Sequence, residues 1–90
     1  MDFAKLRRIM VDSQVRVNDV TSPEVVSAFS TIPREVFVPK GMRASAYAEL
    51  EIEAGETRAM WLPRDLGKML RGLETDASDV SLVIGAGAGY

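Results

Sequence analysis

The chain has 90 residues, 47% of them hydrophobic and 27% charged, and carries a net charge of −2. This length makes one small domain or a piece of a larger one, and the charge gives no electrostatic basis for binding nucleic acid or an anionic membrane. Cysteine and histidine are missing, which excludes disulfides, thiol chemistry and the commonest general base. No apolar run reaches the ~20 residues of a membrane span, so we expect a cytoplasmic protein, and we expect it to be a monomer.

The first predicted element is a helix over residues 3–14, because its apolar residues recur at helical spacing. They are Phe3, Leu6, Ile9 and Met10. The basic residues between positions 5 and 8 lie off this face, and we interpret them as solvated surface rather than as a binding patch. Residues 15–20 alternate like a strand but also fit a helix end and a loop, so both interpretations stay open.

A second helix is predicted at 23–31. Ser22 can cap the free backbone N–H groups, and Pro23 loses nothing at the first helical position by lacking its own N–H. Pro33 ends the helix, because a proline disfavours helical geometry at the preceding residue. The apolar stripe of this helix consists of Val25, Val26, Phe29 and Ile32.

Residues 32–39 follow as a rigid, partly extended connector. Within it, Arg34 and Glu35 are expected to form an ion pair, either exposed or buried where it orders the connector. The run 39–41 marks a turn. A helical turn over 43–48 is expected to end near Tyr47.

Acidic and apolar residues alternate from Glu49 to Ala54, which predicts a strand with one solvated face. Its acids could suggest a metal site, but without other ligands we interpret them as solvated. They are Glu49, Glu51 and Glu53.

A third helix is predicted from Pro63, which suits a first turn, and it ends at Gly72 or in the polar run 74–76. Its core-facing stripe consists of Leu66, Met69, Leu70 and Leu73. Met60 and Met69 are expected to fill gaps in the core.

The chain closes on a short apolar run, Val80 with 82–84, followed by Gly85, Gly87 and Gly89. The run predicts a buried strand, and glycines at alternate positions allow a ligand to approach the backbone. The spacing is G-x-G-x-G, which is typical of S-adenosylmethionine methyltransferases. A dinucleotide fingerprint would need its third glycine at Tyr90. A plain tight turn is the alternative.

Several blocks in unbroken order resemble the protein-L-isoaspartate O-methyltransferase family and together cover nearly the whole chain. They are Met10-Val11-x-x-Gln14 with Arg16, the stretch 25–29, the block from Ile32 to Pro39, Ala46 to Glu49, Pro63 with Lys68-Met69-Leu70, and Ile84-Gly85-x-Gly87-x-Gly89-Tyr90.

The resemblance implies a repair enzyme that uses S-adenosyl-L-methionine to methylate the α-carboxylate of isoaspartyl residues in damaged proteins or peptides. It implies an α/β parent with a doubly wound, Rossmann-like sheet. Residues 1–79 would be its N-terminal helical segment, and residues 80–90 its first strand and glycine turn. This piece would be mostly α with one or two short strands. Gly85, Gly87 and Gly89 would contact the amino-acid end of the cofactor, with Tyr90 beside that pocket.

The chain also departs from the resembled family. Aligned on Pro63, Trp61 takes the position of a serine that the resemblance makes a principal active-site residue, so its indole either lines a substrate site or covers apolar surface. Val83 replaces an acid, and Glu49 replaces an aspartate. A methyltransferase with a different acceptor and an inactive interaction module therefore remain alternatives. The 90 residues alone are expected to be inactive, because half a cofactor pocket cannot hold a near-attack geometry.

Overall fold

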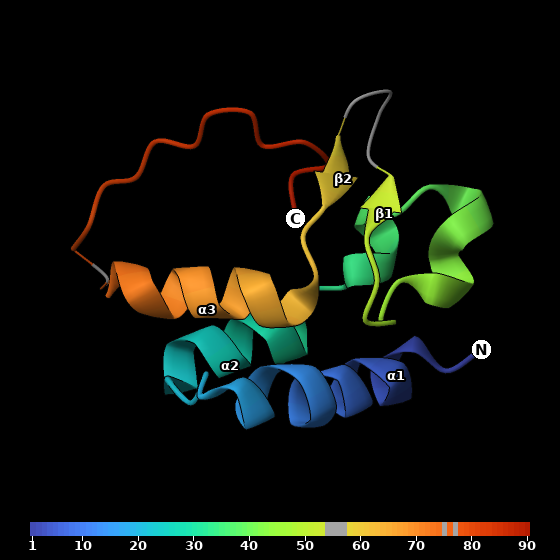
Figure 1. Cartoon of the computed structure of the whole chain (residues 1–90), viewed down its shortest axis with the longest axis horizontal. Coiled ribbons are helices and arrows are strands. Elements are labelled where there is room, and N and C mark those ends of the chain that lie inside the picture. The colour runs from blue at the N-terminus through green and yellow to red at the C-terminus, as the bar shows by residue number, and fades with distance from the viewer. Residues whose placement is uncertain (54–57, 75, 77) are drawn as a thin grey trace.

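The computed structural model describes residues 1–53, 58–74, 76 and 78–90. Helices α1 (Phe3–Met10), α2 (Pro23–Thr31) and α3 (Pro63–Leu73) pack together, and strands β1 (Ile52–Glu53) and β2 (Ala59–Met60) lie beside them (Figure 1). The described part of the chain is therefore mostly helical with a short sheet, as predicted. Within it, no helix has the length and apolar character needed to cross a bilayer.

The first helix is longer than predicted. Asp2 caps α1 by accepting a hydrogen bond from the backbone N–H of Lys5 at 3.0 Å. The helical path then continues through a π-helical stretch, Val11–Val15, and a 3-10 turn, Arg16–Asn18. Residues 15–18 are thus a helix end and not a strand. The expectation that Ile9 shares the apolar face with Met10 is wrong: Ile9 is 51% exposed, because neighbouring residues of α1 point about 100° apart around the helix and Met10 faces the core.

Helix α2 begins at Pro23 and ends where Ile32 turns extended (φ −72°, ψ 123°) before Pro33, as predicted. The predicted cap by Ser22 is wrong. Its hydroxyl donates to the Glu24 carboxylate at 3.0 Å, which takes it away from the backbone N–H groups. Ile32 is exposed because the chain leaves the helix there, so the apolar stripe stops at Phe29.

The connector after α2 is more helical than predicted. It contains 3-10 turns at Arg34–Phe37 and Lys40–Ser45, with extended backbone at Val38 between them. The predicted turn at 39–41 is real, since the N–H of Met42 donates to the carbonyl of Pro39 at 2.8 Å. The helical turn expected over 43–48 is the end of the second 3-10 helix.

The strands β1 and β2 pair antiparallel, with Ile52 opposite Met60 and Glu53 opposite Ala59. The strand predicted from Glu49 is shorter, starts at Ile52, and its predicted end at 54 lies outside the described residues. Ile52 is buried while Glu53 is exposed, which confirms the alternating faces.

The described acids around β1 lie apart from one another on the surface. Glu49 pairs with Arg64 at 2.8 Å on the surface. Among the residues that the structure describes, no cluster of acidic side chains could hold a metal ion.

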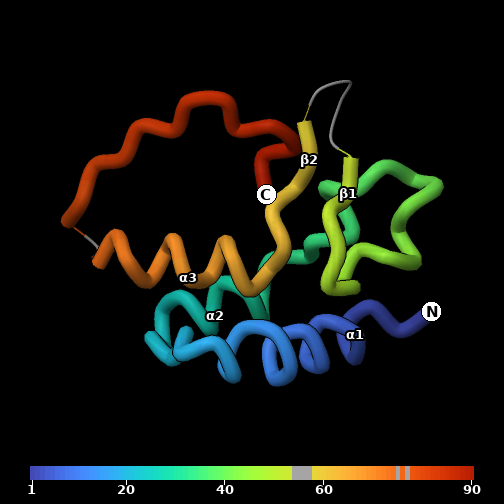
Figure 2. Tube along the Cα trace, in the orientation of Figure 1, coloured from blue at the N-terminus to red at the C-terminus, as the bar shows by residue number. Residues whose placement is uncertain are grey.

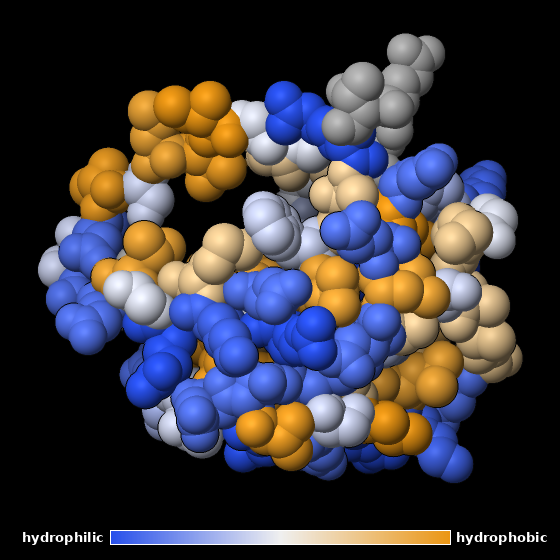
Figure 3. Space-filling view, in the orientation of Figure 1, coloured by the Kyte–Doolittle hydropathy of each residue, from blue (hydrophilic) through white to orange (hydrophobic). Residues whose placement is uncertain are grey.

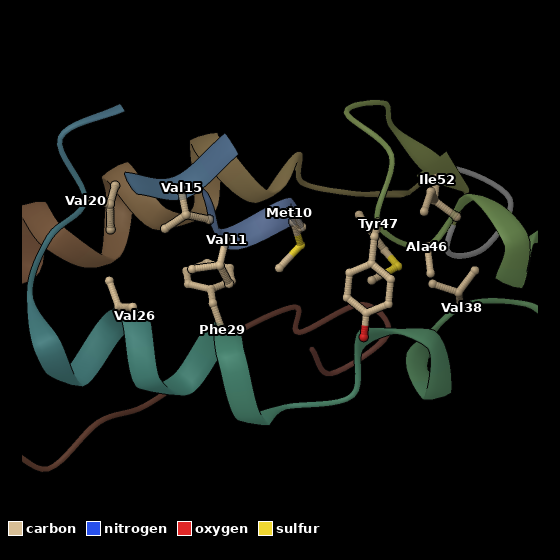
Figure 4. Close-up of a cluster of buried hydrophobic side chains, with 11 residues drawn as sticks. Met10, Val11, Val15, Val20, Val26, Phe29, Val38, Ala46, Tyr47 and Ile52 are labelled. Atoms are coloured by element: carbon tan, nitrogen blue, oxygen red, sulfur yellow. The ribbon is translucent and has the colours of Figure 1, made fainter. Parts of the chain in front are cut away.

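The core lies between the first helix, α2 and α3, and extends to the sheet (Figure 4). Its buried members are Met10, Val11, Val15, Val20, Val26, Phe29, Val38, Ala46, Tyr47, Ile52 and Met60. Burial of Met60 confirms its predicted role as a core filler. In Figure 4, Phe29 of α2 points toward Val11 of the first helical path.

Helix α3 approaches the core through a glycine. A methyl group added at Gly67 would lie 3.2 Å from a Val20 methyl, which is a tight contact, so glycine at this position favours the close approach of α3. The predicted stripe is therefore partly wrong. Met69 is 43% exposed and Leu73 66% exposed, because the face centred on Gly67 turns both away from the core. The helix ends at Glu74, which adopts a left-handed φ of 51°.

Glu35 belongs to a different ion pair from the one predicted. It accepts hydrogen bonds from Arg7 Nη2 at 3.0 and 3.3 Å and from the Tyr47 hydroxyl, while Arg7 Nε donates to the same hydroxyl at 2.8 Å. Arg7 is largely buried and ties α1 to the connector. The expected Arg34–Glu35 pair is wrong, as is the assignment of Arg7 to the solvated surface.

This network predicts acid sensitivity. Burial raises the pKa of the Glu35 carboxyl, but hydrogen bonds from Tyr47, from the Glu35 backbone and from Arg7 outweigh it, so the pKa lies below its ordinary value of 4.5. A carboxyl with a lowered pKa in the folded state stabilises the fold above pH 4.5, and that contribution is lost as the pH falls through the lowered pKa. The Glu35→Gln substitution is expected to lower the free energy of unfolding at pH 7 by about 1–2 kcal/mol. Below pH 4.5 the stability of this variant should fall less steeply than that of the wild type, as measured by urea unfolding.

The Glu51→Gln variant is the matched control, since Glu51 is exposed. It is expected to keep the wild-type dependence of stability on pH. Equal acid sensitivity in the wild type and the Glu35→Gln variant would contradict the assignment to Glu35.

The predicted buried strand near the C-terminus is wrong in this structure. Residues 80–83 have no regular secondary structure, residue 84 lies in a bend, and none of them pairs with a strand among the described residues; Val80 and Ile84 are 100% and 86% exposed. A central parallel strand needs neighbours on both edges, and the described chain supplies none for this segment. In Figure 2, residues 78–90 pass over α3 and return toward β2.

Candidate functional site

A cleft of ≈ 630 Å³ lies between the body of the molecule and its C-terminal segment. Residues 58–61 of the β2 region form one wall, Leu66 and Leu70 of α3 form another, and residues 83–90 close it from the opposite side. Figure 3 shows the hollow under the C-terminal segment, with hydrophobic side chains on its rim. The cleft thus has the β2 region and α3 as its base and a glycine-rich segment as its cover.

The cover is shaped by its glycines. Gly85, Gly87 and Gly89 have φ values of 66°, 61° and 90°, which side chains with a Cβ rarely adopt. The N–H of Gly89 donates to the carbonyl of Ala86 at 3.0 Å, which closes a turn. Arg58 Nη1 donates to the carbonyl of Gly85 at 3.1 Å and fastens the loop to the β2 wall. The loop is therefore a turn that leaves backbone exposed, and not part of a helix.

A methyl group at Gly85 is expected to loosen this loop. A Cβ there would lie 2.8 Å from Arg58 Nη1, and left-handed backbone costs about 1–2 kcal/mol per residue once a Cβ is present. In the Gly85→Ala variant, the amide proton of Gly89 should exchange with solvent about tenfold faster, as measured by NMR hydrogen exchange.

The Gly41→Ala variant is the control, because an added Cβ at Gly41 meets no atom within 4 Å. It should leave the exchange rate of the Gly89 amide unchanged. An unchanged rate in the Gly85→Ala variant would mean that the left-handed turn does not order the loop.

Trp61 and the three glycines line the same cleft, although they are 24 or more residues apart in sequence. The Trp61 side chain is 60% exposed, so its indole offers a flat apolar face to the solvent. Its backbone carbonyl accepts a hydrogen bond from Arg34 Nη2 at 3.1 Å. The hydrogen bond from Arg34 thereby holds the backbone of Trp61 in place, while the indole ring is exposed to solvent.

Arg34 is a cleft residue that sequence reasoning treated only as a partner of Glu35. Its side chain is 0% exposed, and its Nε donates to the carbonyl of Ala46 at 2.6 Å. The Tyr90 ring lies over the guanidinium group, 4.8 Å from the Arg34 Cζ atom. Burial lowers the pKa of Arg34, although not enough to discharge a guanidinium at neutral pH. Arg34 belongs to the block from Ile32 to Pro39 that carries part of the family resemblance.

Tyr90 connects the glycine loop to the core. Its ring packs against Phe37 at a centroid distance of 5.6 Å and against Phe29 at 6.3 Å. Burial raises the pKa of the Tyr90 phenol, and the nearby Arg34 charge acts in the opposite direction. The hydroxyl therefore keeps its proton at neutral pH and can act as a donor.

Among the described residues, the side chains that line the cleft include two arginines, Arg34 and Arg58, and no aspartate or glutamate. Its other contributions are exposed glycine backbone and apolar side chains. Such a lining favours a ligand that is anionic at one end and apolar or flat elsewhere. It offers no general base, so it suits a reaction in which the groups need only be held in place.

Comparison with known proteins places this chain among the methyltransferases. The family model of protein-L-isoaspartate(D-aspartate) O-methyltransferase matches residues 6–90. The chain belongs to the protein-L-isoaspartate O-methyltransferase family, which confirms the resemblance drawn from its motifs.

The protein-L-isoaspartate O-methyltransferase of Petrotoga mobilis (strain DSM 10674 / SJ95) is 38% identical over 90 residues, which cover 100% of this chain and 42% of the relative. The enzyme of the same name from Roseiflexus castenholzii (strain DSM 13941 / HLO8) is 36% identical over 90 residues, covering 100% and 41%. Protein-L-isoaspartate O-methyltransferase 2 of Pelobacter propionicus (strain DSM 2379 / NBRC 103807 / OttBd1) is 38% identical over 86 residues, covering 93% and 37%. The chain thus spans about two fifths of the length of these relatives.

Proposed function

We propose that these residues are the N-terminal part of an enzyme that transfers a methyl group from S-adenosyl-L-methionine to the α-carboxylate of isoaspartyl residues in damaged proteins or peptides. Family membership supports this reaction over an inactive module. The observation that carries the proposal is the turn of three left-handed glycines over the cleft. In this proposal residues 1–79 form the helical base, and residues 80–90 begin a Rossmann-like domain.

The residues of the cleft fit the proposed cofactor. Its volume of ≈ 630 Å³ falls in the range of roughly 300–1,000 Å³ typical of small-molecule sites. A Cβ added at Gly87 would meet no atom within 4 Å, so this backbone borders open space in which a ligand can lie. Gly85, Gly87 and Gly89 would hold the amino-acid end of the cofactor. When bound, S-adenosyl-L-methionine supplies an electrophilic methyl group on its sulfonium.

The reaction suits a cleft without a general base. The α-carboxylate of an isoaspartyl residue is already ionised at neutral pH, because its ordinary pKa is about 3.5. The protein therefore has to align the acceptor and exclude water rather than remove a proton. In this proposal the exposed indole of Trp61 forms the acceptor side of the cleft and shields it from solvent.

The test is methyl transfer by the full-length protein that contains these residues. An isoaspartyl peptide is incubated with radiolabelled S-adenosyl-L-methionine, and the same peptide with an ordinary aspartyl residue serves as the control. We expect methyl ester formation on the isoaspartyl peptide and at least 100-fold less on the control. No transfer to either peptide would overturn the proposal. Residues 1–90 alone are expected to transfer no methyl group, because the chain spans only 42% of the Petrotoga mobilis relative.

A further inference from the structure

Two buried donors in the cleft have no hydrogen-bond partner among the described residues. They are Arg34 Nη1 and the Tyr90 hydroxyl. An unsatisfied donor in a protein interior costs free energy, so pairs of them are uncommon unless a ligand or water completes them. Both residues line the ≈ 630 Å³ cleft, and the ring of one lies over the guanidinium of the other.

The positive charge of Arg34 also has no ion-pair partner among the described residues. Its Nε and Nη2 donate to backbone carbonyls, and within the described residues no carboxylate pairs with it. This differs from Arg7, which is bound to the carboxylate of Glu35. A buried guanidinium that binds only neutral acceptors retains the capacity to bind an anion.

We propose that Arg34 and Tyr90 together bind a carboxylate group of a ligand in the cleft, each donating one hydrogen bond to it. A carboxylate is the matching acceptor, because it has two oxygens, a negative charge and no proton to donate. This inference deepens the proposed function and rests on it.

The carboxylate can reach Arg34 only when the Tyr90 ring moves off the guanidinium, because Arg34 is fully buried in this structure. Such a movement would come from the glycine turn before Tyr90, because glycine accepts a wide range of backbone angles. The hydrogen bond from Arg58 to the Gly85 carbonyl opposes it in the structure without ligand. Tyr90 thus covers the anion site until the ligand displaces its ring.

Two ligands of the proposed reaction carry a carboxylate. One is the amino-acid end of S-adenosyl-L-methionine, and the other is the acceptor, the isoaspartyl α-carboxylate. The chemistry of recognition is the same for both, so the experiment has to separate them.

The test uses the Tyr90→Phe variant of the full-length protein, which removes one hydroxyl and keeps the ring. Calorimetry measures its affinity for S-adenosylhomocysteine, which has the carboxylate, and for 5′-methylthioadenosine, which lacks it. Steady-state kinetics give the KM for an isoaspartyl peptide. Because the variant loses a hydrogen bond to a charged group, it is expected to bind one of the two carboxylate ligands about tenfold or more weakly than the wild type. Affinity for 5′-methylthioadenosine should stay unchanged.

Weaker binding of S-adenosylhomocysteine assigns the site to the cofactor, and a raised KM for the peptide alone assigns it to the acceptor. The melting temperature of the Tyr90→Phe variant should not fall, because the hydroxyl has no partner in the described structure. Unchanged values for both carboxylate ligands, an equal loss for 5′-methylthioadenosine, or a clear fall in melting temperature would each overturn the inference. Failure of the proposed function is seen separately, since the wild type would then neither bind S-adenosylhomocysteine nor transfer methyl groups.

Discussion

Replacing Arg34 by methionine is expected to lower the free energy of unfolding by about 3 kcal/mol. The guanidinium donates to the carbonyls of Ala46 and Trp61, and each hydrogen bond from a charged donor contributes roughly 1.5–3 kcal/mol. Relief of the desolvation cost of a buried cation offsets part of that loss. Domains of this kind have a total stability of roughly 5–15 kcal/mol, so the urea midpoint should fall by more than about 1 M.

The matched control for this substitution is Arg43→Met. Arg43 is exposed on the 3-10 helix Lys40–Ser45, close in sequence to the Ala46 carbonyl that Arg34 binds. A surface substitution of this kind should change stability by less than about 0.5 kcal/mol. Equal midpoints for the two variants would show that the contacts of Arg34 do not hold the connector and the Trp61 segment together.

The Phe29→Ala substitution is expected to lower the free energy of unfolding by about 3–5 kcal/mol, because truncating a buried phenylalanine leaves a cavity. Phe29 lies where α2, α3 and the C-terminal residue meet. Its ring is close to Gly67 of α3 and packs against the Tyr90 ring at 6.3 Å. A loss of this size approaches the whole stability of a 90-residue domain, so the variant should be largely unfolded at 37 °C.

Circular dichroism during urea unfolding measures this effect, with Val17→Ala as the control. Val17 is 68% exposed, so its truncation should cost less than about 0.5 kcal/mol. Wild-type stability in the Phe29→Ala variant would mean that α2 and α3 are held together by contacts other than this ring.

The parts of the fold that sequence reasoning predicted correctly have local causes. Helices α2 and α3 begin at Pro23 and Pro63, because proline at a first helical position acts through its own backbone alone. The predictions that were wrong concern residues whose environment is set by partners far away in the sequence. Arg7 is largely buried because Glu35, 28 residues later, accepts its hydrogen bonds, and the spacing of residues within the first helix does not contain that information. Met69 is exposed because the close approach of α3 takes place at Gly67.

The candidate site was predictable in part for the same reason. The position of the glycine turn could be predicted from the spacing of its glycines, because the tolerance of glycine for positive φ does not depend on distant partners. The buried state of Arg34 could not, because its acceptors are backbone carbonyls at positions 46 and 61, which have no signature in the sequence. The strand expected at 80–84 has the right composition, but strand formation requires a neighbour as well as suitable residues.

The bare apolar segment 80–84 determines how the 90-residue chain behaves in concentrated solution. Its backbone N–H and C=O groups and its aliphatic side chains face water, which makes it a template for pairing with the same segment of another molecule. Asp79 stands directly before it and Asp76 three residues earlier, and charge repulsion from these residues opposes such stacking. The isolated chain is therefore best kept dilute to prevent fibril-like self-association.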